Sequence, residues 1–147
     1  MRAVTKRCFS SILGATFFAV VPAASAQSTG PAPYGLDEFS ASLKLRPSYQ
    51  HCLDAAGGTT PGMQDCINAE FSYQDKRLNF VYKRLMSVAS ASERTRLRNE
   101  EREWIVAKEK RCAVPGSPGQ GDIIDSASCV VTETAKRATG LESRKIK

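Results

Sequence analysis

Histidine is nearly absent from this chain, because His51 is the only one among 147 residues. This excludes most catalytic and metal sites that need several imidazoles. The sequence also lacks a Gly-x-Ser-x-Gly nucleophile elbow and a phosphate-binding loop. Cys52 and Asp54 lie beside His51, but one imidazole without a third partner is weak evidence for catalysis. The sequence therefore predicts no catalytic residue, no cofactor and no enzymatic activity.

Closely spaced cysteine pairs are missing as well. Structural zinc sites usually bring cysteines two to four residues apart, and redox pairs are usually Cys-x-x-Cys. Thirteen residues separate Cys52 from Cys66, and sixteen separate Cys112 from Cys129. We therefore predict no metal site and interpret the four cysteines as disulfide partners.

Four cysteines allow three pairings. Cys52 lies in a short predicted helix directly before the turn that leads to the helix carrying Cys66. Cys112 ends one predicted helix and Cys129 lies in the next. The order of these elements favours the pairs Cys52–Cys66 and Cys112–Cys129.

Residues 1–26 contain no acidic residue and have the pattern of a secretory signal peptide. A basic start is followed by the apolar run Phe9–Val21 and by Ala24-Ser25-Ala26, a small-residue cleavage site. The alternative, a membrane anchor, is disfavoured because this run is too short to span a bilayer. No cysteine follows the run directly, so no lipid anchor is predicted. We expect a periplasmic or secreted protein without a stable membrane anchor after cleavage.

Removal of the signal peptide would lower the net charge of the chain. The whole chain carries a formal charge of +6, and cleavage before Gln27 leaves 121 residues with +3. Acidic residues alternate with the basic ones in the remaining chain, and most aromatic residues follow the apolar stripes. The sequence therefore predicts no nucleic-acid partner.

The rest of the chain predicts helices. Residues 27–46 are a flexible leader with no more than a weak helical turn over 36–46, and the domain itself spans residues 47–147. Ser48 is a candidate N-cap for a short helix that ends at Gly57-Gly58. Thr60 and Pro61 suit the start of a long helix that runs to about residues 87–90.

Two further helices follow. The sequence Ser90-Ala91-Ser92-Glu93 fits a capping box and predicts a helix that ends near Cys112. Residues 113–121 are a loop rich in proline and glycine, after which Asp122 or Asp125 can cap a last helix through about Gly140. The predicted fold class is all-α: a small antiparallel helical bundle of about three main helices plus a short N-terminal helix, stapled by two disulfides.

A set of motifs resembles a known family. The set comprises Tyr49-x-x-Cys52, Gly58-Thr59-Thr60-x-Gly62-Met63-x-x-Cys66, Glu70, Gln74-Asp75-x-x-Leu78-Asn79-x-x-Tyr82-x-x-Leu85-Met86, Leu97, Arg102-x-Trp104-Ile105, Arg111-Cys112, Cys129 and Thr132-x-x-x-x-Arg137. Over about residues 47–141 the chain is similar to the LprI-type lysozyme-inhibitor family. This resemblance implies a small, exported, helical, disulfide-bonded bacterial protein that binds a protein partner such as lysozyme.

The resemblance also singles out residues. The motif positions Asp75, Leu78, Asn79, Tyr82 and Trp104 are expected to be structural more than to contact a partner. For partner binding, two regions are candidates: the loop residues Pro115, Gly116 and Ser117, and the helix residues Arg98 and Arg102.

Two functions follow as hypotheses. The first is a lysozyme inhibitor whose loop over residues 113–121 enters the lysozyme cleft. The alternative is a periplasmic interaction or scaffold module that binds another envelope component through the charged helix over residues 93–111.

Overall fold

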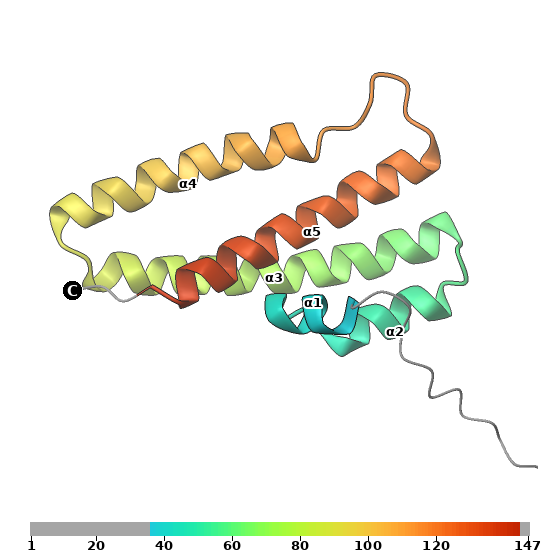
Figure 1. The fold of residues 1–147 in the computed structure, drawn as a ribbon, viewed down its shortest axis with the longest axis horizontal. Coiled ribbons are helices and arrows are strands. Elements are labelled where there is room, and N and C mark those ends of the chain that lie inside the picture. Colours follow the sequence, from blue (N-terminus) through green and yellow to red (C-terminus); the bar gives the residue numbers. More distant parts are fainter. Residues whose placement is uncertain (1–35, 145–147) are drawn as a thin grey trace, which may run out of the picture. The chain divides into compact units, whose positions relative to one another are not determined.

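The computed structural model describes residues 36–144, and this part of the chain contains five helices and no strand. They are α1 (Leu36–Leu43), α2 (Pro47–Ala55), α3 (Thr60–Val88), α4 (Ala91–Arg111) and α5 (Gln120–Glu142) (Figure 1). The predicted all-α class is confirmed. The expected signal peptide and residues 27–35 of the leader lie outside the described residues. Within residues 36–144, no helix is both long enough and apolar enough to cross a membrane.

Helices α3 and α5 form the centre of the molecule. The two helices run in the same direction, while α4 runs opposite to both (Figure 1). One cluster of buried side chains joins α3, α4 and α5 through Leu78, Val81, Leu85, Ala89, Leu97, Ala138 and Leu141. A second cluster around Ile67, Ile124 and Val131 packs against α2 and against Leu45, which lies between α1 and α2. Burial of these apolar stripes holds the bundle together.

The starts of the N-terminal helices differ from the prediction. Residues 36–43 form a helix of eight residues instead of a weak turn, and its Leu43 is buried. Helix α2 begins at Pro47, so Arg46 and not Ser48 is its N-cap. Proline suits the first helical position because its missing N–H has no partner there in any case.

Helix α3 also begins one residue earlier than predicted. Its N-cap is Thr59, and Thr60 is already helical. The Thr60 hydroxyl donates to the Gln120 side chain at the start of α5, 2.9 Å away, instead of capping its own helix. The predicted stop before α3 is confirmed, because Gly57 and Gly58 both have positive φ angles, a conformation that glycine adopts without steric cost.

The predicted capping box of α4 is confirmed. The Ser90 hydroxyl accepts from the Glu93 N–H, and the Glu93 carboxylate accepts from the Ser90 N–H. Helix α5 begins at Gln120 with Gly119 as its N-cap, so neither Asp122 nor Asp125 occupies that position. Asp122 instead accepts from the Gly119 N–H at 2.8 Å, which stabilises the same helix start from its first turn.

Both disulfides join the pairs that the sequence favours. Cys52 is linked to Cys66 and Cys112 to Cys129, with Cα–Cα distances of 5.7 and 5.6 Å. The first ties α2 to α3, and the second closes the loop between α4 and α5. Each constrains the unfolded chain, a contribution of about 3 kcal/mol for loops of this length.

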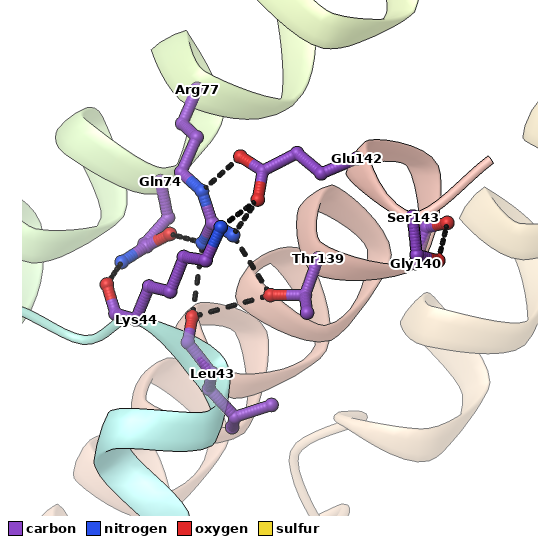
Figure 2. Close-up of polar contacts among 8 residues, drawn as sticks. All are labelled: Leu43, Lys44, Gln74, Arg77, Thr139, Gly140, Glu142 and Ser143. Carbon is purple, nitrogen blue, oxygen red and sulfur yellow. Dashed lines mark hydrogen bonds and ion pairs between the residues drawn. The ribbon is translucent and has the colours of Figure 1, made fainter. Parts of the chain in front are cut away.

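A polar network around Arg77 connects α1, α3 and α5 (Figure 2). The Arg77 guanidinium donates to both carboxylate oxygens of Glu142, each at 2.7 Å, and to the Thr139 hydroxyl at 2.8 Å. It also donates to the Leu43 carbonyl and to the Gln74 side chain. All five N–H donors of the guanidinium are therefore satisfied.

Candidate functional site

A groove lies between α3 and α4, with α5 contributing to its lining. The cavity measures about 370 Å³. Its lining residues are Asp75, Leu78, Asn79 and Tyr82 from α3, Arg98, Glu101, Arg102, Trp104, Ile105 and Lys108 from α4, and Thr134 from α5. All five motif positions expected to be structural therefore meet here, together with both candidate arginines.

The α3 wall of the groove is polar at its rim. The Asn79 side-chain amide donates to the Asp75 carboxylate at 2.9 Å and to the Asp75 carbonyl at the same distance. Both bonds lie within α3, so Asn79 does not bridge two helices. Leu78 is buried and joins the core, whereas Tyr82 is half-buried and packs against it. Leu78 and Tyr82 thus have packing roles, while Asp75 and Asn79 face the groove.

Trp104 organises the α4 wall. Its ring is half-buried against the core cluster, and two cations lie over it: Lys108 Nζ at 4.8 Å and the Arg137 guanidinium at 5.9 Å from the ring centre. Arg137 also forms an ion pair with Glu101 at 2.9 Å. The expected packing role of Trp104 fits these contacts, which hold the middle of α4 against α5.

Arg98 and Arg102 are the exposed cations of the groove. They are four residues apart on α4, so their side chains share one side of the helix. Among residues 36–144, Arg98 makes one long hydrogen bond, to the Thr95 hydroxyl at 3.4 Å. Arg102 forms no ion pair or hydrogen bond with any residue of the described range 36–144. Such guanidinium groups suit bidentate recognition of carboxylates or phosphates.

The loop between α4 and α5 is a second candidate surface, and none of its residues lines the groove. Pro115, Gly116 and Ser117 are all exposed. The disulfide Cys112–Cys129 and a 2.6 Å hydrogen bond from the Ser126 hydroxyl to the Cys112 carbonyl fix the ends of the loop. The structure therefore separates the two predicted groups of partner-binding residues into an exposed loop and a groove.

The sequence did not predict a buried polar network on α3. Glu70 and Gln74 are fully buried on α3. Glu70 accepts from the Arg46 side chain at 2.7 Å and from the Gln74 amide at 2.8 Å, and Gln74 in turn accepts from Arg77. Glu70, Gln74 and Arg77 are spaced by four and three residues, which places them on one side of α3. This spacing was the feature of the sequence that could have predicted the network. The chain lacks a metal-binding cluster over the described residues, because no three His, Cys, Asp or Glu side chains gather there.

The fold and these surfaces define a small, disulfide-bonded, all-helical protein with an exposed loop and a charged groove. Residues 52–141, more than half of the chain, match the family model described as lysozyme inhibitor LprI. The chain therefore belongs to the LprI lysozyme-inhibitor family. Comparison with curated proteins and with solved structures finds no match.

Proposed function

We propose that this protein is exported and inhibits lysozyme by binding the enzyme and blocking its cleft. The observation that carries the proposal is the match to the LprI lysozyme-inhibitor family over residues 52–141. The pattern of residues 1–26 supports export, and the two disulfides suit an oxidising compartment. We propose a binding protein without catalytic activity of its own.

The loop at residues 113–119 is the proposed inserting element. Lysozyme cleaves its substrate between two carboxylates in a cleft, so an inhibitor needs a convex element to enter it. The loop is exposed along its length and carries no charged side chain. Its N–H groups and the Ser117 hydroxyl are donors suited to carboxylates. The covalent link at its base reduces the entropy that binding has to overcome.

A cell-wall lysis assay tests this proposal. Purified oxidised protein is added to lysozymes of several types, and the fall in turbidity of a cell-wall suspension is followed. We expect inhibition of at least one type at micromolar excess. Lysis at the uninhibited rate with every type would rule out the proposed function.

The loop assignment has its own test. Deletion of Pro115–Ser117 should abolish inhibition, because it removes the middle of the loop and keeps Gly119, the N-cap of α5, and the cysteines of both disulfides. The matched control is the double variant Arg98→Ala/Arg102→Ala, which alters the groove and keeps the loop. Undiminished inhibition by the deletion variant, with inhibition lost in the arginine variant, would move the contact to the groove.

A second candidate function is an envelope interaction module without lysozyme inhibition. The observation that favours it is the pair Arg98 and Arg102, which are exposed on α4 without an ion pair in residues 36–144. Retention of the protein on an anionic cell-wall polymer, weakened by Arg98→Ala/Arg102→Ala, would support this function if no lysozyme is inhibited. If the polymer does not retain the protein, this second function is ruled out.

A further inference from the structure

The C-terminal half of α3 has an outer face that combines basic and apolar side chains. Residues 76–88 include four basic residues and no acidic one. Phe80 and Val88 are 70% and 67% exposed, although side chains of this kind are usually buried in the core. Lys76, Lys83 and Arg84 are exposed beside them. We call these five residues the α3 patch.

The α3 patch is arranged around Phe80. Lys76 lies four residues before it, and Lys83 and Arg84 lie three and four residues after it, so all three cations neighbour the ring on the helix surface. None of the three forms an ion pair with another residue in the described part of the chain. The positive charge around the exposed ring is therefore not compensated within residues 36–144.

A shallow groove continues the patch toward α1 and α5. It measures about 470 Å³, and its apolar part includes Val81, Leu85 and Leu141 beside Phe80 and Val88. Its charged side chains are Lys44, Arg84, Glu142 and Arg144. The only acid among them, Glu142, is engaged by Lys44 at 2.6 Å and by Arg77 at 2.7 Å. Among the described residues, the lining of this groove therefore adds no unpaired acid beside the patch.

The α3 patch lies apart from the other candidate surfaces. Residues Asp75, Asn79 and Tyr82 line the groove between α3 and α4, on another side of the same helix. The loop at residues 113–119 contributes to neither lining. The two groove linings share no residue.

We infer that the α3 patch binds the surface of an anionic phospholipid bilayer. An exposed aromatic ring and a valine can enter the boundary between headgroups and acyl chains, while flanking lysine and arginine side chains meet the phosphates. Charge complementarity favours an anionic bilayer, because three exposed cations that form no ion pair within residues 36–144 attract an anionic surface. Binding is peripheral and reversible. It would hold the protein at a membrane surface, and it does not depend on the proposed inhibition of lysozyme.

Vesicle sedimentation tests this inference. The chain from Gln27 to Lys147, with both disulfides formed, is mixed with vesicles of phosphatidylcholine with or without phosphatidylglycerol. We expect binding only when phosphatidylglycerol is present, and release by high salt because the attraction is screened. Equal binding to both vesicle types, or binding to neither, would overturn the inference.

Charge-reversal variants assign the binding to the patch. Lys83→Glu/Arg84→Glu should lower the partition constant for phosphatidylglycerol vesicles at least about tenfold. The matched control Arg96→Glu/Lys110→Glu produces the same net charge from exposed positions on α4 and should bind nearly as the original chain does. An equal loss in both variants would mean that net charge alone is sensed, which contradicts a specific patch. Far-UV circular dichroism confirms that each variant is helical.

A fluorescent label gives an independent readout. The native cysteines of the Gln27–Lys147 chain are paired in disulfides, so a new cysteine at position 80 or 106 can be labelled selectively with an environment-sensitive dye. Val106 on α4 is 65% exposed, which makes Val106→Cys a matched control for Phe80→Cys. The label at position 80 should shift to the blue on anionic vesicles, and the label at position 106 should not. A blue shift at position 106 alone would place the membrane contact on α4 and overturn the assignment.

Discussion

At the residue scale, Arg77 connects three helices through a single side chain. Its side chain is only 11% exposed, and its five hydrogen bonds connect three helices (Figure 2). Breaking one partner of a buried pair leaves the other partner unsatisfied, which costs more than the pair itself contributes. The network therefore fixes how α1 and the end of α5 sit on α3.

Replacement of Arg77 should be strongly destabilising. We expect Arg77→Ala to lower the free energy of unfolding by about 3 to 5 kcal/mol, measured by urea denaturation of the oxidised protein. Arg77→Lys should lose an intermediate amount, because an ammonium group cannot reproduce the planar fork. The control Lys83→Ala removes an exposed cation from the same helix and should change stability by less than about 0.5 kcal/mol. A similar effect of Lys83→Ala and Arg77→Ala would contradict this account.

The carboxylate of Glu142, which pairs with Arg77, should make the free energy of unfolding depend on pH. Hydrogen bonds from Arg77, with further attraction from Lys44, lower the pKa of Glu142 from 4.5 to about 2. Because the folded state holds the deprotonated form, this contribution is present above pH 4.5 and disappears as the pH falls toward 2. Unfolding measured from pH 7 to pH 2 should show a smaller acid-dependent loss for Glu142→Gln than for the original chain. Identical pH profiles would show that the pair is not linked to folding.

At the element scale, α4 is the least anchored of the long helices. Leu97 is its only buried residue, and Ile105 and Val106 are exposed. Trp104 and the cations over its ring, the disulfide after the last turn, and the ion pairs Arg111–Glu133, Arg137–Glu101 and Arg144–Glu100 add further contacts to the bundle. The groove between α3 and α4 exists because α4 does not pack along its whole length.

Leu97 should therefore determine how firmly α4 is attached. We expect Leu97→Ala to cost about 2 to 4 kcal/mol, the usual range for truncating a buried leucine. Val106→Ala, on the same helix but exposed, should cost less than about 0.5 kcal/mol. Thermal unfolding of both variants measures the difference. Equal destabilisation by the two would mean that α4 is not held through Leu97.

Most of the helices could be predicted from the sequence, whereas their exact starts and the groove could not. Hydrophobic spacing and the Ser90–Glu93 capping box predicted the long helices, because these signals are local. The disulfide pairs followed from the order of the elements. The N-caps at Thr59 and Gly119 were missed by one to a few residues, since several neighbouring side chains are suitable caps. The groove was not predicted, because whether α4 packs closely or stands apart depends on contacts between distant residues.

At the scale of the whole molecule, stability is distributed unevenly. Helices α3 and α5 supply most of the buried residues and pack directly on one another, while the disulfides link α2 to the first turns of α3 and the end of α4 to the middle of α5. Regions with few buried apolar contacts open at lower free energy than the core. The proposed inserting loop is tied to the better-packed part by its disulfide, which keeps it presented even when α4 opens.

Native-state hydrogen exchange should reveal this hierarchy. Amides in the middle of α3 and α5 should exchange last, near the global free energy of unfolding, and those of α4 should exchange earlier through local opening. Leu97→Ala should accelerate exchange in α4 selectively if the global stability is restored with a stabilising salt or osmolyte. The matched control Val106→Ala should leave the order unchanged. If α4 amides exchanged as slowly as those of α3, the bundle would open as one unit, and α4 would be an integral part of the core instead of a separately opening wall of the groove.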